Sequence, residues 1–521
     1  MEELRTVEAR LSAAQSAYEA GQFDTTIAVL RRGGVPDDPV AIALLRDAYL
    51  GLGELTAALG EMSRLRRIAD DHRLRRQARF TVGRLRETDP RWIPALPPAP
   101  AGAASRGEVV LHLLKESLPH SQTGYTFRSR GTLEAQRRAG YTPVVVTSLG
   151  FPWYQGREEH QVADGVLPVE HVHEVPHHRL EAPARWSLPV KRVPFDLVLA
   201  EQARRTAAIA DEVRPAVIQA GSGFRGYDQA LVGLANARRR DVPFVYEVRG
   251  FLEATWTSRT DLQERGEYYR RRRGQDERCM SEADLVVTIA GSMLDELVAR
   301  GVDPDRIRVV PNVVDVERFT PRPRDEGLAR ELGVHDRFVV GYISNLGNRE
   351  GVEHLLRATA LLVAEGREVA CLVAGDGPER PRLLQLVDEL GLTGTAVLPG
   401  HVPNDRIESY YALIDAFVVP RIDDQAARLV TPLKPLEAMA MRRPVITSDL
   451  PALREMVPPG DRGLGFPPGD SAALAGAIAQ LMDEPQLAEQ LTGSAFEWVH
   501  RERTLEANVR RYREVMDVVL S

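Results

Sequence analysis

Cysteine is nearly absent from this chain, and its two cysteines, Cys279 and Cys371, lie far apart in the sequence. Their number and separation exclude a disulfide framework and a cysteine-based metal site. The sequence also lacks a window apolar and long enough to span a membrane. Its charged N-terminus opens an amphipathic helix pattern rather than a secretory signal. We therefore expect a cytoplasmic protein with at most peripheral contact at the inner face of the membrane.

A strong charge of one sign is missing as well. The 67 basic and 74 acidic residues give a formal net charge of -7, which is mild for 521 residues. Such a mixed balance argues against nucleic acid as the main partner. The length is too great for one ordinary core and indicates roughly three domain-sized units.

The first unit, residues 1–88, is rich in Ala, Leu and Arg and has helical periodicity. The segments 17–23 and 48–55 look alike and lie about one tetratricopeptide period apart, each with a helix, a Gly turn and a second helix. Helical hairpins of this kind need neighbours to cover their apolar faces. We predict a small tetratricopeptide-like helical module that either caps the rest of the chain or binds a partner protein.

A Pro/Ala stretch at residues 89–107 predicts a linker, because proline suits neither helix nor sheet interiors. Short apolar strands then alternate with helices over residues 108–318 and again over residues 319–494. This alternation predicts α/β structure with two parallel, doubly wound sheets and a cleft between two facing Rossmann-like domains. Residues 495–521 form a last amphipathic segment.

An anion site is predicted near the C-terminal end, in the stretch 428–449. Pro432 and Pro435 suit the entry from a loop into a helix, where a missing N–H costs nothing. The N–H groups of that first turn, with Lys434 beside them, would attract a phosphate. Glu437 lies in the same turn, where its carboxylate can accept hydrogen bonds from sugar hydroxyls.

The run from Thr431 to Val457, TPLKPLEAMAMRRPVITSDLPALREMV, resembles the donor-binding signature of retaining glycosyltransferases of family 4, which have the GT-B fold. The resemblance implies that Glu437 holds the ribose of a donor and that a loop holds its pyrophosphate. The residues of that loop are Thr431, Pro432, Leu433 and Lys434. It also implies that the terminal segment 495–521 crosses back onto the first Rossmann-like domain.

Further donor-binding positions follow from the same resemblance. Gly124 ends the loop after the first strand and would approach the donor phosphates and the acceptor. Gly375 and Gly377 form a turn that would lie beside the nucleotide. His401 belongs to the loop where the base would sit, although a surface turn is the simpler interpretation.

The chain departs from the family pattern at three charged positions. Leu429 stands eight residues before Glu437, where relatives have a second Glu. Asn345 and Glu350 stand near the Arg and Lys that neutralise the leaving diphosphate in relatives. Because an unpaired pyrophosphate is costly in a closed cleft, other cations must compensate. We expect Arg349, Arg421 and Lys434 to supply that charge.

Two candidate catalytic residues follow the strand that ends at Val248. Arg249 would face either the donor phosphate or the acceptor, and Glu253 would be an acceptor-side carboxylate. Each can instead form an interdomain salt bridge. No histidine base is predicted, because Gln219 and Gly221 replace the histidines that are common in relatives.

Other charged runs have simpler interpretations. Residues 270–273 are four arginines, which predict a solvated helix face that could also meet anionic lipid. The segment 161–194 is predicted as an irregular loop. It holds a group of histidines that is not predicted to bind metal: His171, His173, His177 and His178. No metal site is predicted at Asp423 and Asp424 either, because GT-B enzymes generally work without metal.

The sequence therefore predicts a retaining, metal-independent glycosyltransferase without a cofactor. It would move a sugar from a nucleoside diphosphate sugar, UDP- or GDP-linked, to a hydroxyl of a sugar, a lipid-linked glycan or a small molecule. Two alternatives remain open. One is a non-catalytic sugar-nucleotide-binding scaffold protein, and the other is a different GT-B reaction such as epimerisation or pseudo-glycosyl coupling.

Overall fold

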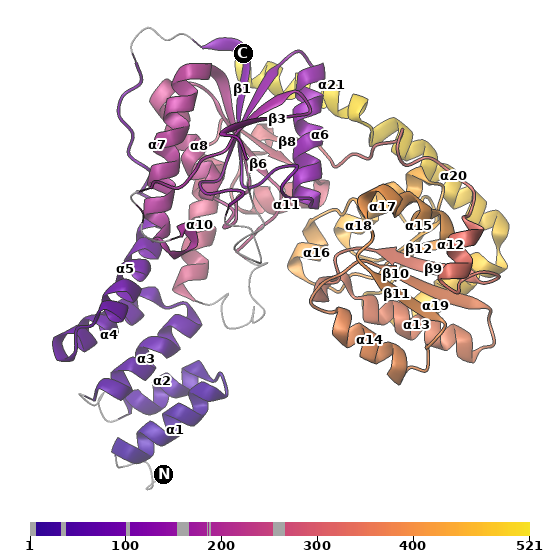
Figure 1. Cartoon of the computed structure of the whole chain (residues 1–521), viewed down its shortest axis with the longest axis horizontal. Helices are drawn as coiled ribbons and strands as arrows, with labels where there is room; N and C mark the ends of the chain where they lie inside the picture. Colours follow the sequence, from indigo (N-terminus) through magenta and orange to yellow (C-terminus); the bar gives the residue numbers. More distant parts are fainter. Residues whose placement is uncertain are drawn as a thin grey trace.

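A computed structural model describes residues 7–32, 38–100, 105–153, 166–184, 186, 189–253 and 266–521. It contains a helical N-terminal module and two α/β domains, each with its own sheet (Figure 1). Residues 101–104 of the predicted linker and 161–165 of the predicted loop lie outside the described residues. Among the described residues, no helix is long and apolar enough to cross a membrane.

The N-terminal module consists of two helical hairpins and a fifth helix. Gly21 and Gly53 have positive φ angles at the two hairpin turns, which is the conformation that glycine adopts without steric cost. Buried Leu45 and Met62 belong to a separate hydrophobic core of the module. The helices are α1 (Val7–Glu19), α2 (Phe23–Arg31), α3 (Pro39–Leu52), α4 (Leu55–Ile68) and α5 (His72–Glu87).

The described part of the predicted linker lies on the first α/β domain. Trp92, Ile93 and Leu96 pack against the core of that domain. Arg239 donates hydrogen bonds to the carbonyl groups of Pro97 and Pro98. The stretch is extended, as its prolines predict, but its contacts tie the module to the domain instead of separating the two.

The first sheet has eight strands in the order β3-β4-β2-β1-β5-β6-β7-β8. All neighbours pair in parallel except β3 with β4. The eight strands are mostly buried in the middle of the sheet, which is typical of a sheet covered on both faces, but not at its edge, where β3 has no buried residue. They are β1 (Arg106–Leu114), β2 (Thr142–Thr147), β3 (Val169–Val172), β4 (Val175–His178), β5 (Pro215–Gly221), β6 (Phe244–Val248), β7 (Leu285–Thr288) and β8 (Ile307–Val309).

The prediction of an irregular loop over 161–194 is wrong where β3 and β4 form an antiparallel hairpin. His173 and Glu174 form its two-residue turn with φ angles of 49° and 66°. Tight hairpins favour such left-handed residues, but the usual Asn-Gly or Asp-Gly signal is missing here. The short strands and the absent turn signal hid the hairpin from the sequence pattern.

Helices cover both faces of the first sheet. One face carries α6 (Gly124–Arg138), and the other packs on α7 (Phe195–Val213) and α8 (Asp228–Arg240). The cysteine Cys279 is buried in α10, in the same core as α7 and α8. The remaining elements of this domain are η2 (Val190–Arg192), α10 (Glu267–Ser281), α11 (Gly291–Ala299) and η3 (Pro304–Arg306).

The second sheet has six parallel strands in the order β11-β10-β9-β12-β13-β14. Its strands are β9 (Phe338–Ile343), β10 (Val369–Ala374), β11 (Ala396–Gly400), β12 (Ala416–Val419), β13 (Val445–Ser448) and β14 (Leu464–Phe466). The helices around it are α12 (Glu326–Glu331), η4 (Asn348–Glu350), α13 (Val352–Ala364), α14 (Arg380–Glu389), η5 (Asn404–Arg406), α15 (Ile407–Leu413), α16 (Gln425–Leu429), α17 (Lys434–Ala440), α18 (Pro451–Met456) and α19 (Ser471–Asp483).

The chain ends in two helices that connect the two α/β domains, drawn in yellow in Figure 1. Helix α20 (Pro485–Glu502) packs on the second domain through Leu491 and Ala495, so the return to the first domain starts after residue 502 and not at residue 495. Helix α21 (Leu505–Leu520) then lies along α6. Its Tyr512 hydroxyl is 3.0 Å from the hydroxyl of Thr132, and both side chains are buried.

The buried Tyr512–Thr132 hydrogen bond gives a test of this return. We expect Tyr512→Phe to lower the free energy of unfolding of the first domain by about 1 kcal/mol, because one buried partner loses its bond. Urea unfolding followed by circular dichroism measures the loss. The double variant Tyr512→Phe/Thr132→Val should cost less than the sum of the two single variants. Strict additivity would show that α21 does not depend on this contact.

Candidate functional site

A cavity of about 1010 Å³ lies between the two α/β domains. Loops that follow strands β9, β10 and β11 line it from the second domain, as do Lys434 and Glu437 of α17. The first domain contributes the loop before α6, one face of that helix, and the turn between β3 and β4. Because parallel sheets bind ligands beyond the carboxyl ends of their strands, this position is the expected one for a substrate cleft.

The donor loop, residues 431–434, meets the first domain across this cavity. A Cβ atom at Gly124 would lie 3.8 Å from the Leu433 side chain, and both residues line the cavity. Thr431 is buried, and its carbonyl accepts a hydrogen bond of 3.0 Å from the Asn312 side chain. The predicted residues Gly124, Leu433, Lys434 and Glu437 therefore come together, while Thr431 and Pro432 lie behind them as support.

Glu437 has an environment that suits a hydrogen-bond acceptor. The hydroxyl of Tyr411 donates to its Oε2 at 2.6 Å. Burial raises the pKa of Glu437 above its ordinary value, while the positive charge of Lys434 and the Tyr411 hydrogen bond act in the opposite direction. Its carboxylate lines the cavity, and Lys434 forms no ion pair with any residue in the described part of the chain. The pair offers a hydrogen-bond acceptor and a cation on one wall, and the cation is close enough to lower the pKa of the acceptor.

The expected anion site on the first turn of α17 needs correction. The N–H groups of Leu436 and Glu437 already donate to the Leu433 carbonyl, at 3.0 and 3.3 Å, and Pro435 has no N–H. The helix has only seven residues, so its dipole is small. The attraction for an anion on this wall therefore rests on the Lys434 ammonium group.

The glycine-rich turn after β10 lies directly against the loop after β9. Gly375 has φ of 137°, and a Cβ there would lie 1.8 Å from the Ser344 carbonyl oxygen. At Gly377 a Cβ would lie 2.5 Å from the Leu346 carbonyl oxygen. Only glycine fits either position, and the result is exposed backbone at the cavity wall. Gly375 and His401 line the cavity, whereas Gly377 lies behind it.

In this structure Arg349 and Arg421, which were expected to neutralise a diphosphate, each pair with a carboxylate outside the cavity lining. The guanidinium of Arg349 pairs with Asp424 at 2.7 Å. Arg421 is 3.3 Å from Glu350 and donates to the Val430 carbonyl, and neither arginine lines the cavity. Each cation is therefore compensated by a carboxylate of this domain. Glu350 itself has a lowered pKa: burial would raise it, but Arg421 and hydrogen bonds outweigh that effect.

Leu429 occupies the position where a second glutamate was expected. It packs against the apolar core of the first domain, and its carbonyl accepts a hydrogen bond of 3.0 Å from the Ser292 hydroxyl. Glu455 reinforces the same contact by accepting from the N–H of Gly291 at 2.9 Å. Leu429 therefore joins the domains and does not point a polar group at a substrate.

The catalytic assignment of Glu253 is also wrong, because its side chain is 2% exposed and is 2.8 Å from Arg300. Both belong to the first domain, so the predicted interdomain salt bridge does not form either. Burial and the charge of Glu253 raise the pKa of neighbouring Asp276 to about 8. Glu253 does not line the cavity. Its position after a strand end suggested a cleft residue, but the chain turns inward there.

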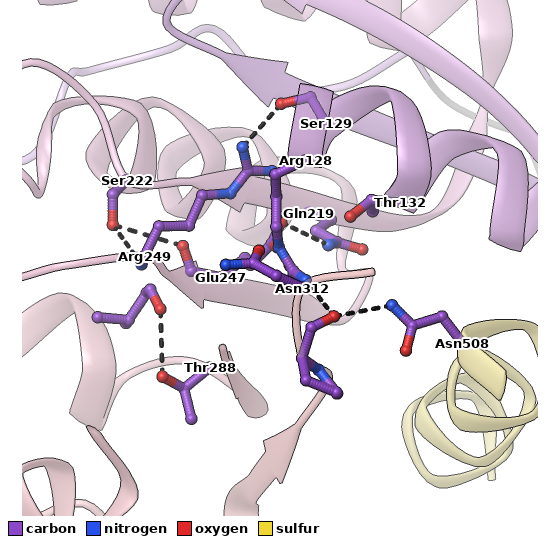
Figure 2. Close-up of polar contacts among 12 residues, drawn as sticks. Arg128, Ser129, Thr132, Gln219, Ser222, Glu247, Arg249, Thr288, Asn312 and Asn508 are labelled. Carbon is purple, nitrogen blue, oxygen red and sulfur yellow. Dashed lines mark hydrogen bonds and ion pairs between the residues drawn. The ribbon is translucent and has the colours of Figure 1, made fainter. Parts of the chain in front are cut away.

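Arg249 belongs to a buried ion cluster instead of the cleft surface (Figure 2). Its guanidinium is 2.7 Å from Glu247 and 2.7 Å from the Ser129 hydroxyl. Arg128 approaches the same carboxylate at 2.8 Å from the other side. Two arginines share one carboxylate that is 1% exposed, and they hold the pKa of Glu247 at about 2 against the effect of burial. The catalytic assignment of Arg249 therefore does not hold.

The ion cluster reaches the connection between the two α/β domains. Arg128 donates to the Pro311 carbonyl at 2.7 Å, and Asn508 of α21 donates to the same oxygen at 2.9 Å. The next residue, Asn312, binds the carbonyl of Thr431. Figure 2 shows these side chains converging from α6, β6 and α21. The cluster thus links the wall of the first domain to the donor loop through three hydrogen bonds.

Sequence reasoning missed several residues of the site. Tyr411 supports Glu437 from α15, and Arg318 lines the cavity while it pairs with buried Glu408. Asn312 was visible in the turn-rich crossover PNVVDVERF, but no spacing rule connects it to Thr431. These contacts join segments far apart in the sequence, so no local pattern predicts them.

Among the described residues, no three His, Cys, Asp or Glu side chains are placed to hold a metal ion. His177 is buried, and its Nδ1 lies 3.0 Å from the Ser117 hydroxyl. Burial lowers the pKa of His177 to about 3, with a further contribution from Arg179. His171, His177 and His178 lie on the strands of the hairpin β3–β4, and His173 lies in its turn.

Two facing Rossmann-like domains with a cleft between them and a terminal helix that returns to the first domain define a GT-B protein. Residues 123–313 match the family "Glycosyl transferase 4-like domain". Residues 337–484 match the family "Glycosyl transferases group 1". The two matches lie on opposite sides of the cavity, one in each α/β domain.

Solved structures agree with this fold. Sucrose-phosphate synthase from Thermosynechococcus elongatus superposes with a TM-score of 0.62 at 20% identity, over 78% of this chain and 98% of that one. HepE from Anabaena, solved in complex with UDP, gives a TM-score of 0.61 at 20% identity, over 78% and 99%. At this level of identity the likeness establishes the fold, and the GT-B prediction is confirmed.

Curated relatives cover a shorter part of the chain. Alpha-D-kanosaminyltransferase from Streptomyces kanamyceticus is 30% identical over 32% of this chain and 42% of its own length. The 2-deoxystreptamine glucosyltransferase of the same organism is 31% identical over 40% of this chain and 51% of its own length. D-inositol 3-phosphate glycosyltransferase from Acidothermus cellulolyticus is 30% identical, over 46% and 54%. The chain spans about half the length of these relatives, and all three are glycosyltransferases.

The ion cluster predicts a specific pH dependence of stability. Glu247 has a pKa of about 2 in the folded protein, below its ordinary value of 4.5. Its ionisation therefore stabilises the fold above about pH 4.5, and this contribution disappears as the pH falls toward 2. Between pH 4.5 and pH 3 we expect Glu247 alone to cost about 2 kcal/mol. Urea midpoints measured from pH 6 to pH 3 test this.

The matched variant is Glu247→Gln, which keeps the shape of the side chain and removes its titration. It should be less stable at pH 7 by about 3 kcal/mol or more, because two buried arginines lose their carboxylate. Its stability should then fall less steeply with acid than that of the wild type. Exposed Glu514→Gln serves as the control with the wild-type slope. Equal slopes for all three proteins would contradict the assignment.

Proposed function

We propose that this protein is a retaining, metal-independent glycosyltransferase that moves a sugar from a nucleoside diphosphate sugar to a hydroxyl acceptor. The observation that carries the proposal is the wall formed by Lys434, Glu437 and Gly375, which combines a cation, a supported carboxylate and exposed backbone in one cavity. The two domain matches and the glycosyltransferase relatives support the same reaction class. The cavity volume of about 1010 Å³ is large enough for a nucleotide sugar.

The donor's diphosphate would lie in front of Lys434, whose ammonium group lacks an ion partner within the described chain. Glu437 would accept hydrogen bonds from the ribose hydroxyls, held in place by Tyr411. The backbone at Gly375 would admit the nucleotide, and His401, which also lines the cavity, would contact the base. UDP is the favoured nucleotide, because HepE was solved with UDP and with UDP-glucose.

In the transfer step the bond between the sugar's anomeric carbon and the diphosphate oxygen breaks, and its electron pair stays on the diphosphate. The acceptor hydroxyl oxygen attacks the anomeric carbon from the same face. Its proton passes to the leaving phosphate oxygen, and the configuration is retained. Lys434 stabilises the negative charge that develops on the diphosphate. The protein's contribution is mainly to position donor and acceptor and to exclude water.

The acceptor would bind on the first-domain side of the cavity, which α6 and the turn between β3 and β4 line. Relatives are named for the transfer of sugars involving 2-deoxystreptamine and D-inositol 3-phosphate. We propose a hydroxyl-bearing sugar, lipid-linked glycan or small molecule of this general kind.

A second candidate function is a non-catalytic protein that binds sugar nucleotides. The observation in its favour is that Arg349 and Arg421 are compensated by Asp424 and Glu350 and do not line the cavity. Binding would survive in such a protein, while turnover would not.

Turnover with a panel of UDP- and GDP-sugars separates the two candidates. We expect slow donor hydrolysis with at least one sugar, faster transfer when cyclitol or sugar acceptors are added, and an unchanged anomeric configuration by NMR. Activity should persist in the presence of EDTA. Binding without hydrolysis or transfer for the whole panel would favour the second candidate, and inversion of configuration would refute the retaining mechanism.

The raised pKa of Glu437 predicts how donor affinity depends on pH. The ionised carboxylate accepts the ribose hydroxyls, so protonation weakens binding as the pH falls, starting at a higher pH than for an ordinary carboxyl group. Isothermal titration with UDP-glucose from pH 8 to pH 5 measures this, because its diphosphate ester does not titrate in that range.

The matched variant Glu437→Gln should bind UDP-glucose about tenfold or more weakly at pH 8 and should show little pH dependence. Lys434→Met should weaken binding of UDP by a similar factor while it leaves binding of uridine nearly unchanged. An unchanged affinity of Glu437→Gln would remove this residue from the donor site.

A further inference from the structure

Positive charge is concentrated in one short part of the N-terminal module. Residues 55–88 hold nine arginines against four acidic residues, although the chain as a whole is at -7. The rest of the protein is therefore distinctly acidic. When positive charge is gathered in one place to this degree, a surface for an anionic partner is a better explanation than a solvated helix face.

Six of these arginines surround the turn between α4 and α5, and we name this surface the arginine corner. All six side chains belong to exposed residues. They come from the last turn of α4 and from the first half of α5: Arg66, Arg67, Arg73, Arg75, Arg76 and Arg79.

The acidic residues nearby compensate only part of this charge. Asp70 lies 3.1 Å from Arg66 and 3.7 Å from Arg75. Asp71 caps α5 by accepting from the N–H of Leu74 at 2.7 Å. The other members of the corner form no ion pair with any residue that the structure describes. The corner therefore presents uncompensated guanidinium groups to its surroundings.

Two exposed apolar side chains accompany the arginines. Ile68 at the end of α4 is 49% exposed, and Val82 on α5 is 47% exposed. Arginine carries a long apolar stem, so the corner combines hydrocarbon with charged heads on one outer face. This is the composition of a surface that lies on an anionic membrane.

The module is fixed to the first α/β domain at the opposite end of the same two helices. The N–H and hydroxyl of Thr56 donate to Glu267 at 2.7 and 2.6 Å, and Tyr268 donates its N–H to the Gly53 carbonyl at 2.9 Å. Gln275 donates to the Glu87 carbonyl at 3.1 Å. The corner is consequently the free end of a rigidly mounted helix pair, and in Figure 1 α4 extends outward from both sheets.

The arginine run 270–273, predicted as a solvated helix face that could also meet lipid, forms ion pairs with nearby glutamates. Arg271 pairs with Glu267 at 2.7 Å, and Arg273 pairs with Glu277 at 2.7 Å. Arg270 reaches Glu54 of the module at 3.8 Å. Three arginines of that run are therefore paired with carboxylates, whereas four members of the arginine corner form no ion pair within the described chain.

We propose that the arginine corner docks the protein on an anionic phospholipid membrane. The corner is the outer edge of a helix pair, which fits a flat surface. Its arginines come from two helices at irregular spacings, which mobile lipid headgroups can match without a fixed arrangement of acids. The flanking Ile68 and Val82 add apolar area that reaches the interface. This docking is independent of the sugar-transfer chemistry.

Vesicle flotation of the full-length protein in 150 mM salt tests the proposal. Vesicles of phosphatidylcholine with half phosphatidylglycerol should carry the protein, and pure phosphatidylcholine vesicles should not. The variant Arg67→Glu/Arg73→Glu/Arg79→Glu changes three exposed, unbonded side chains and should bind the anionic vesicles at least tenfold more weakly. Binding of the wild type should weaken steeply as the salt concentration rises.

The matched control is Arg330→Glu/Arg357→Glu/Arg510→Glu, which changes the net charge equally at exposed positions outside the module. It should float like the wild type. The proposal is wrong if the wild type does not bind anionic vesicles, or if both triple variants lose binding to the same extent. It is also wrong if the corner variant binds anionic vesicles as well as the wild type does, even if it loses binding to an acidic protein. Thermal unfolding of each variant confirms that the module remains folded.

Discussion

Glu247 is a carboxylate buried between two arginines, and the arrangement of the whole cleft depends on how its charge is compensated. Arg128 and Arg249 lie 2.8 and 2.7 Å from this carboxylate, and their charges offset the cost of its desolvation. Each arginine is also held by a second contact. For Arg128 that contact is the carbonyl of Pro311 in the connection between the domains. A buried charge cluster tolerates little movement, because any displaced member is left unpaired. The position of the donor loop, bound by Asn312, therefore follows from chemistry inside the first domain.

Charge compensation also explains why the donor wall differs from its sequence pattern. Arg349 and Arg421 lie near the positions expected for the cations of a diphosphate site. In this structure Arg349 pairs with Asp424, and Arg421 pairs with Glu350. Lys434 forms no ion pair within the described chain, so its ammonium group can interact with an anion in the cavity. On the second-domain wall of this cleft Lys434 stands beside the supported Glu437, and Arg130 and Arg318 also line the cavity.

The N-terminal module likewise contains two kinds of arginine: some pair with carboxylates of the protein, and others have no such partner within the described chain. Arg86, near the first α/β domain, pairs with Asp196 of that domain at 3.5 Å, whereas four of the six arginines of the arginine corner form no ion pair within the described chain. Helical hairpins with glycine turns were visible in the sequence, and the structure adds how they are mounted. The tetratricopeptide likeness of the module stays a prediction.

Local patterns in the sequence determined the alternation of strands and helices, the two-domain GT-B fold, and the loop-to-helix segment that brings Leu433, Lys434 and Glu437 to the cavity, because period and turn chemistry act over a few residues. Only the tertiary structure decided the partners of the charged side chains. Glu253 and Arg249 turn inward, and Tyr411 reaches Glu437, through contacts between segments distant in the chain. Burial and pairing of a charge depend on what folds against it, and no local pattern contains that information.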